Sequence, residues 1–229
     1  MLENFSRRFH KGYRHLESIE QIKRLSPKEV LAKTERVRKS FIGIPIYMGL
    51  NSYPYSPFEL TADVPFHASL FEDAAALIIH NDPENFENAD IILSEGDRGG
   101  GPLAEEIGRM TGIPIVLANW HKEIPVDLPN VIVVETKIGF SGNGYIVVSG
   151  LRPGQKVILV DDLLSSGGTS EALIKAIEGA GATIVRAFFA GEKVNKKGRE
   201  YLKQQFPDVE VTSLVRFVSE GKFTREADI

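Results

Sequence analysis

The stretch VILVDDLLSSGGTS, residues 157–170, decides the fold. Its four apolar residues predict a buried strand, and Asp161 and Asp162 follow where that strand is expected to end. A short loop of hydroxylated residues and glycines comes next, before an amphipathic segment that predicts a helix over 170–178. A strand, a loop and a helix in this order are typical of parallel α/β sheets, which bind ligands at the carboxyl edge of their strands.

The loop in this stretch has the features of a phosphate-binding site. Main-chain N–H groups at a helix N-terminus can surround a phosphate, and glycines let the phosphate approach the backbone. No lysine follows the glycines, which excludes the loop of nucleotide triphosphatases. Residues 142–144 begin like a dinucleotide fingerprint, but Val147 stands where its last glycine belongs. We therefore expect a phosphate monoester to bind at Ser165, Ser166, Gly167, Gly168 and Thr169.

The adjacent acids Asp161 and Asp162 need partners if both are buried. Burying an ionised carboxylate is costly without a cation or a hydrogen-bond donor. The hydroxyls of a sugar diol would satisfy such a pair. The alternative is that these acids cap the turn that follows the strand. A capping role would explain one acidic residue at this place better than two adjacent ones.

The strand, loop and helix pattern recurs along the chain. Strands are expected at 91–93, 115–118, 157–160, 183–190 and 209–215, and helices at 103–110 and 170–178. Another helix is expected to begin at a capping box on Ser69. Segments 131–134 and 145–148 instead predict an inserted antiparallel hairpin with its tip at 137–144. The predicted fold class is α/β, a parallel sheet flanked by helices.

The N-terminal segment differs from the rest in charge. Residues 1–40 carry a net charge of +6 and residues 41–229 carry −10, although the whole chain carries only −4. Apolar spacing and the Ser26-Pro27 start predict amphipathic helices over 14–25 and 27–40. We therefore expect a helical extension, 1–40, and one main domain, 41–229. The basic residues of the extension serve either packing and assembly or a nucleic-acid contact. Aromatic residues interleaved with the basic ones would favour nucleic-acid binding, and the expected helices lack that pattern.

Composition excludes several classes of protein. The 229 residues contain no cysteine, which excludes disulfides, thiolate nucleophiles and zinc–cysteine sites. The longest apolar runs have four to six residues, whereas a membrane span needs about 20. No apolar stretch follows the early basic residues, so a secretory signal is not expected and the cytoplasm is the expected location.

The stretch 157–170 resembles the phosphoribosyl-pyrophosphate motif of type I phosphoribosyltransferases. The resemblance extends over roughly residues 89–217 and is strongest to adenine phosphoribosyltransferases and archaeal hypoxanthine enzymes. KGREYL at 197–202 and TSL at 212–214 are similar to the adenine enzymes. Residues 139–141, GFS, before Tyr145 and Ile146 are more like the archaeal group.

The resemblance implies roles for the loops. Asp161 and Asp162 would hold the ribose 2- and 3-hydroxyls, and residues 165–169 would cradle the 5-phosphate. Arg98 would clamp the diphosphate, because a guanidinium pairs bidentately with phosphate oxygens. The pyrophosphate loop would comprise Glu95, Gly96, Asp97, Arg98 and Gly99. Mg²⁺ would bind through substrate oxygens rather than direct protein ligands. A homodimer is expected, with the N-terminal helices as candidates for its interface.

The implied reaction joins phosphoribosyl pyrophosphate to a purine base and gives a nucleoside 5-monophosphate and pyrophosphate. Adenine is the first expected base, and hypoxanthine or guanine the next. The hairpin is a candidate lid over the substrates. The alternative function is a regulator that senses phosphoribosyl pyrophosphate and binds nucleic acid through its basic N-terminus.

Three further residues carry open alternatives. Lys122 would either reach the pyrophosphate or stay solvated, and Trp120 would either stack on the base or pack internally. Adenine enzymes usually carry Glu-Tyr-Gly in the lid, where this chain has residues 138–140, Ile-Gly-Phe. Glu135 would supply the purine-facing acid only if the alignment slips by three residues.

Overall fold

The computed structural model describes residues 19–49, 54–123, 131–138 and 142–227. The predictions for residues 1–18, in the basic extension, and for 139–141, at the tip of the hairpin, lie outside the described residues.

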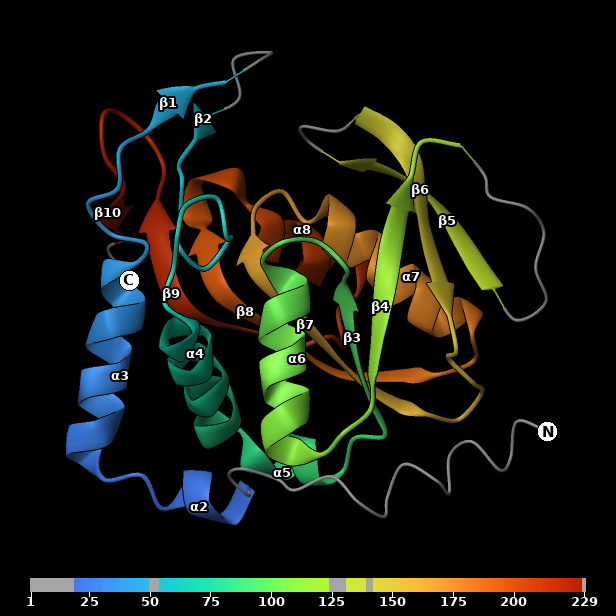
Figure 1. The fold of residues 1–229 in the computed structure, drawn as a ribbon. Helices are drawn as coiled ribbons and strands as arrows, with labels where there is room; N and C mark the ends of the chain where they lie inside the picture. The colour runs from blue at the N-terminus through green and yellow to red at the C-terminus, as the bar shows by residue number, and fades with distance from the viewer. Residues whose placement is uncertain (1–18, 50–53, 124–130, 139–141, 228–229) are drawn as a thin grey trace.

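The centre of the described fold is an eight-stranded sheet with the strand order β10-β9-β8-β7-β3-β4-β6-β5 (Figure 1). Its strands are β3 (Ile91–Glu95), β4 (Ile115–His121), β5 (Val131–Ile138), β6 (Gly142–Ser149), β7 (Lys156–Leu164), β8 (Thr183–Lys193), β9 (Val211–Val218) and β10 (Arg225–Glu226). The five central strands, from β9 to β4, run parallel. The hairpin β5–β6 and the short β10 add antiparallel strands at the two edges. The predicted α/β fold class is confirmed. The predicted antiparallel hairpin is present, but its pairing continues to Ile138 and Gly142, well into the predicted tip at 137–144.

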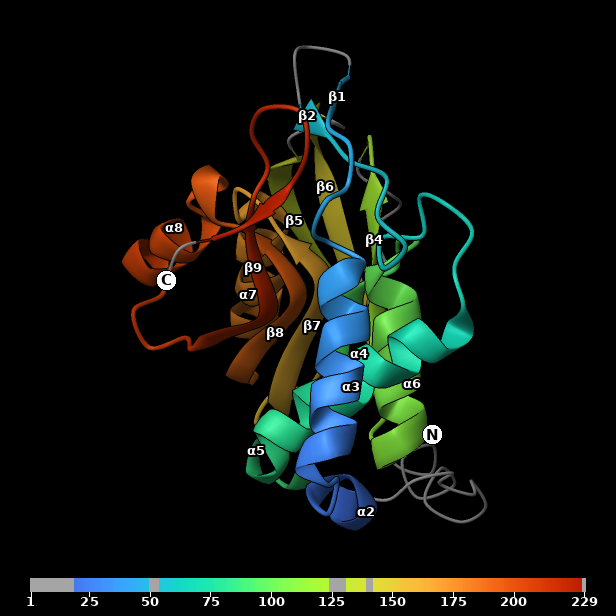
Figure 2. The same ribbon diagram turned by 90° about the vertical axis from the view of Figure 1, so that its left-hand side faces the viewer.

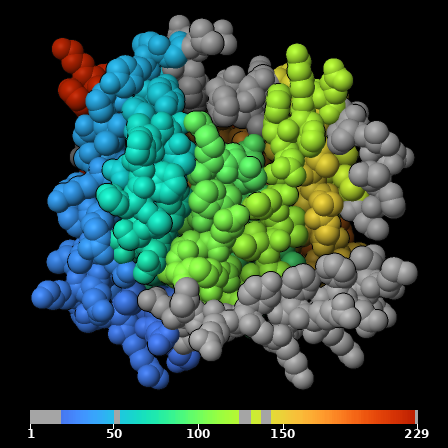
Figure 3. Space-filling model, viewed as in Figure 1, coloured from blue at the N-terminus to red at the C-terminus, as the bar shows by residue number. Residues whose placement is uncertain are grey.

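Helices cover both faces of the sheet (Figures 1 and 2). On one face lie α2 (Ile19–Lys23), α3 (Pro27–Lys39), α4 (Ala68–Asn81), α5 (Pro83–Glu87) and α6 (Gly100–Thr111). The surface over this face is formed by blue, teal and green parts of the chain that lie side by side (Figure 3). Helix α4 contributes little to this surface because most of its residues are buried. On the other face lie α7 (Gly168–Gly179) and α8 (Gly198–Gln205). Within the described part of the chain, no helix combines the length and apolar character needed to cross a bilayer.

Alternation along the central strands builds two apolar cores. Ile92, Ile158 and Phe188 belong to the core beneath α4 and α6. Leu93 and Leu159, each next to one of these in sequence, belong to the core on the side of α7. Successive side chains of a strand point to opposite faces, so a strand that is covered on both sides is apolar throughout.

The start of α4 corrects the prediction of a capping box at Ser69. The helix begins at Ala68, and its N-cap residue is His67, which makes no side-chain capping bond. Phe66, before the cap, instead packs on Phe71 with ring centres 4.9 Å apart. This pair is a hydrophobic staple, which directs the chain into the helix by packing rather than by hydrogen bonds.

The described part of the basic segment packs into the same core. Ser26 and Glu29 form the capping box at the start of α3. Val37 on α3 is fully buried. Lys33 and Arg36, also on α3, both pair with the buried carboxylate of Asp73 on α4. Part of the positive charge therefore serves packing within the chain, one of the two roles expected from the sequence.

Two short strands complete the described elements. These are β1 (Tyr47–Met48) and β2 (Pro54–Tyr55), which pair with each other, and a single 3-10 turn, η2 (Val194–Lys196), follows β8. The chain after β2 runs to the carboxyl edge of the main sheet, where the parallel strands end at the top of Figure 1.

Candidate active site

A cavity of about 470 Å³ lies at the carboxyl edge of the parallel strands. It is lined by Gly49, Tyr55, Ser56, Phe58, Thr61, Asp63, Glu95, Asp97, Arg98, Asp161, Asp162, Leu163, Ser165, Ser166, Gly167, Gly168, Thr169, Ser170 and Lys193. The two predicted acids, the predicted phosphate loop and charged residues of the predicted pyrophosphate loop thus meet in one cavity.

The acids lie within β7 rather than after it, which corrects the predicted end of this strand. Pairing with β8 continues to Leu164, whereas pairing with β3 stops at Leu159. β7 therefore continues past its pairing with β3. Asp161 and Asp162 lie in the part of β7 that is not paired with β3, and their carboxyl groups face the loop that follows β3.

Both acids are almost fully buried, with 5% of Asp161 and 7% of Asp162 exposed. Burial, and then the negative charges around them, raise the pKa of both carboxyl groups well above the usual value. The charges that act on Asp161 are those of Asp162, Asp97 and Glu95. Those that act on Asp162 are Asp97, Glu95 and Asp63. Hydroxyl donors or a cation from a ligand would stabilise the ionised pair.

The loop after β3 fits against these acids because it lacks side chains there. A Cβ atom on Gly99 would lie 1.8 Å from Oδ2 of Asp162, and one on Gly100 would lie 2.5 Å from Oδ1 of Asp161. Oδ1 of Asp97 accepts the main-chain N–H groups of Gly99 and Gly100 at 3.1 and 2.8 Å. The acids therefore face the N-terminus of α6, whose partial positive charge favours anions.

Arg98 stands at the rim of the cavity. Its side chain is 72% exposed, and Nη2 lies 2.8 Å from Oδ1 of Asp63. Asp63 is buried and also accepts the hydroxyl hydrogen of Thr61 at 2.5 Å. The guanidinium is thus within reach of a ligand that enters from solvent.

The phosphate loop has the predicted form of a turn into a helix. Gly167 caps α7 with φ of +90°, a backbone conformation that favours glycine. A Cβ atom on Gly198 would lie 2.1 Å from the main-chain oxygen of Ser165, so the start of α8 packs directly behind the loop. Burial raises the pKa of Glu95 to about 7, with Asp97 adding to the effect and a hydrogen bond with Thr169 opposing it.

Lys193 and the segment 54–63 are site residues that the sequence analysis missed. Lys193 ends β8 at 4% exposure, with Nζ 5.7 Å from the ring centre of Phe58. Burial and Lys196 lower the pKa of Lys193 to about 8, against the opposing effect of Asp162 and Asp63. Its position at the carboxyl end of a predicted parallel strand could have identified Lys193 as a candidate site residue. The position of the segment 54–63 over the cavity depends on long-range packing.

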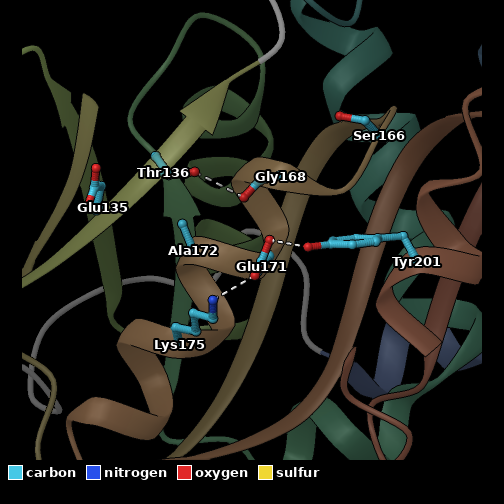
Figure 4. A pocket seen from close by; sticks show the side chains of 8 residues that line it. All are labelled: Glu135, Thr136, Ser166, Gly168, Glu171, Ala172, Lys175 and Tyr201. Atoms are coloured by element: carbon cyan, nitrogen blue, oxygen red, sulfur yellow. Dashed lines mark hydrogen bonds and ion pairs between the residues drawn. The ribbon is translucent and has the colours of Figure 1, made fainter. Parts of the chain in front are cut away.

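Lys122, Trp120 and Glu135, for which the sequence left two roles open, do not line this cavity. Lys122 is exposed beyond the end of β4. A Cβ atom on Gly144 would lie 2.7 Å from the indole of Trp120, so this ring packs on β6. Of the two roles considered for Trp120, this contact favours internal packing. Glu135 lines a separate pocket of about 300 Å³ next to the phosphate loop (Figure 4).

The fold and this cavity define a class: an α/β protein with a glycine-rich loop and buried acids at the carboxyl edge of a parallel sheet, where proteins of this architecture bind ligands. The sequence profile of the phosphoribosyl transferase domain matches residues 71–224. The chain therefore belongs to the phosphoribosyl transferase domain family, and the resemblance seen in the sequence is confirmed.

Similar proteins lie among purine enzymes. The chain is 32% identical over 167 residues to a hypoxanthine/guanine phosphoribosyltransferase of Ferroglobus placidus, covering 70% of this chain and 84% of the relative. It is 33% identical over 172 residues to that of Methanothermococcus okinawensis, covering 74% and 88%. The adenine phosphoribosyltransferase structure of Rhodothermus marinus has a TM-score of 0.63 at 18% identity, covering 81% of this chain and 99% of that one. That of Trypanosoma brucei has a TM-score of 0.66 at 16% identity, covering 80% and 79%.

Proposed function

We propose that this protein transfers the 5-phosphoribosyl group from phosphoribosyl pyrophosphate to a purine base. The observation that carries the proposal is the meeting of three groups in one cavity. These are the buried acids of β7, the glycine-rich loop at the start of α7, and Arg98 with the N-terminus of α6. Their chemistry matches a ribose diol, a phosphate monoester and a diphosphate, which are the three parts of this substrate.

In the proposed reaction, the bond from the ribose anomeric carbon to pyrophosphate breaks and a bond from that carbon to a purine nitrogen forms. Asp161 and Asp162 would accept hydrogen bonds from the ribose hydroxyls, and the main-chain N–H groups of residues 166–169 would hold the 5-phosphate. Arg98 would stabilise the charge that develops on the departing pyrophosphate. Because both reactants are held in place, no covalent intermediate with the protein is needed.

Carboxyl groups around the cavity suit Mg²⁺, which prefers oxygen ligands. Within the described residues, however, no three His, Cys, Asp or Glu side chains are placed to hold a metal ion together. Mg²⁺ would therefore be held mainly through oxygens of the substrate, beside these carboxylates, rather than by a set of direct protein ligands. When bound, Mg²⁺ would neutralise charge on the pyrophosphate.

For the base, we propose hypoxanthine or guanine ahead of adenine. The ammonium of Lys193 lies inside the cavity beside Phe58 and can donate hydrogen bonds but cannot accept them. A purine with an oxygen at position 6 accepts such a bond, whereas the amino group of adenine does not. The relatives of Ferroglobus placidus and Methanothermococcus okinawensis, at 32% and 33% identity, are hypoxanthine/guanine phosphoribosyltransferases, whereas the adenine phosphoribosyltransferase structures are only 18% and 16% identical.

We also propose a homodimer that uses the outer face of α3. Leu31 on this helix is 69% exposed, while Val37 on the same helix is fully buried. Light scattering on the purified protein and on Leu31→Glu would test the assembly. A monomer in both cases would contradict it.

The decisive assay uses purified protein, phosphoribosyl pyrophosphate, Mg²⁺ and each of adenine, hypoxanthine, guanine, xanthine, uracil and orotate. We expect nucleotide from hypoxanthine and guanine, with a smaller yield from adenine. Product from adenine alone would overturn the base assignment and leave the transferase intact. No nucleotide from any base would overturn the proposed function.

A further inference from the structure

A second pocket lies next to the phosphate loop and is lined by residues of β5, α7 and α8. Its volume is about 300 Å³, and it shares Ser166 and Gly168 with the cavity. Tyr201 on α8 and Lys175 on α7 point into it from opposite sides, with Glu171 between them (Figure 4). The pocket therefore contacts the phosphate loop at Ser166 and Gly168.

Glu171 is held at both of its oxygens. The Tyr201 hydroxyl donates to Oε2 at 2.6 Å, and Nζ of Lys175 donates to Oε1 at 2.7 Å. Burial by itself would raise the pKa of Glu171, but the hydrogen bonds from Lys175 and Tyr201 outweigh it and keep the pKa below the usual value. The carboxylate is thus ionised and fixed in place.

The position of this carboxylate matters because Glu171 is the fourth residue of α7. The first turn of α7 carries the main-chain N–H groups proposed to bind the 5-phosphate. A negative charge near a helix N-terminus interacts with the same partial positive charge that attracts a phosphate. If Glu171 were free to turn toward that end, it would compete with the phosphate and repel it.

Tyr201 also touches the loop itself. A Cβ atom on Gly167 would lie 3.1 Å from Cδ1 of Tyr201, so the ring packs against the glycine that caps α7. From the opposite side, the Thr136 hydroxyl on β5 donates to the main-chain oxygen of Gly168 at 3.4 Å. Tyr201 thus contacts the loop through its ring and the first turn of α7 through its hydroxyl.

We propose that Tyr201 is a positioning residue for the phosphate loop, which keeps the carboxylate of Glu171 directed away from the N-terminus of α7 and thereby sets the affinity for a 5-phosphate. The proposal rests on the proposed function, because it assumes that this loop binds the 5-phosphate of the substrate.

The test compares Tyr201→Phe, which keeps the ring and removes the hydroxyl, with the unmodified protein. Calorimetry with ribose 5-phosphate as the probe should give about fivefold weaker binding, the size expected for a charge near a helix terminus. KM for phosphoribosyl pyrophosphate should rise by a similar factor with kcat unchanged. Lys175→Met removes the other donor without altering α8 and should weaken binding in the same direction. The exposed Tyr47→Phe is the matched control and should bind as the unmodified protein does.

Adding Glu171→Gln to Tyr201→Phe separates positioning from general structural damage. If the free charge causes the loss, the double variant should recover binding to within about twofold, whereas lost packing would not be rescued. Unchanged binding in Tyr201→Phe, or a loss that Glu171→Gln does not rescue, would overturn the role of Tyr201. Failure of the unmodified protein to bind ribose 5-phosphate would instead overturn the proposed function, and this inference with it.

Discussion

Replacing Gly99 by alanine tests the contact between the loop after β3 and the acids of β7. Gly99 has φ of −107° and ψ of −54°, which alanine adopts without strain. The added Cβ atom would nevertheless lie 1.8 Å from Oδ2 and 2.5 Å from Cγ of Asp162. Either the loop or the aspartate must move, so the effect of the substitution is steric.

The expected size follows from that overlap. Overpacking a closely packed site costs about 1–3 kcal/mol of unfolding free energy, and about 1 kcal/mol lowers the melting temperature of a chain of this size by about 2–4 °C. A displacement of about 1 Å in a reacting group lowers activity by about 100-fold. Urea unfolding followed by circular dichroism and kcat/KM for phosphoribosyl pyrophosphate measure the two effects.

Gly101→Ala is the matched control, since its Cβ atom would meet nothing closer than 3.9 Å. Gly101 is the second residue of α6, where the helix preference of alanine over glycine is smaller than in a helix interior, so this variant should match the unmodified protein in stability and activity. Asp162→Ala added to Gly99→Ala should restore stability but not activity. If Gly99→Ala matches the unmodified protein in both measurements, the proposed packing against Asp162 is wrong.

Three further predictions follow from the charges of the cavity. Asp161→Asn with Asp162→Asn should abolish turnover but raise the unfolding free energy at pH 7. The folded protein raises the pKa of both acids, so their ionisation destabilises the fold as pH rises above the ordinary pKa of 3.8. Denaturant titration at several pH values should therefore show that the variant's gain in unfolding free energy grows with pH. Because the pKa of Lys193 is lowered to about 8, kcat/KM for hypoxanthine should fall as pH rises through that value, and Lys193→Arg, which stays charged, should remove this step from the profile. Arg98→Met should weaken inhibition by pyrophosphate at least tenfold and leave the affinity for ribose 5-phosphate nearly unchanged; equal losses for both ligands, measured by calorimetry, would contradict the assignment of Arg98 to the diphosphate.

Much of the cavity could be predicted because its key residues are close together in sequence. The acids, the phosphate loop and the start of α7 lie within residues 157–170, and their order alone places them at one sheet edge. The loop containing Arg98 follows the neighbouring strand β3, so parallel pairing brings it to the same edge. Prediction failed where a local pattern had a competing explanation, as at Ser69, where aromatic packing rather than a capping box begins α4.

The sequence by itself determined the central parallel strands, the helices α6 and α7 between them, and the family, and it named the candidate residues of three proposed substrate-binding groups. Each of these depends on periodicity or on chemistry within a few adjacent residues. Only the tertiary structure decided that the pairing of β7 with β3 stops before the two acids, that Lys193 and Asp63 line the cavity, and that Tyr201 reaches Glu171. These features depend on strand register and on contacts between distant segments. Such contacts form only when the whole core packs, so no local pattern in the chain encodes them.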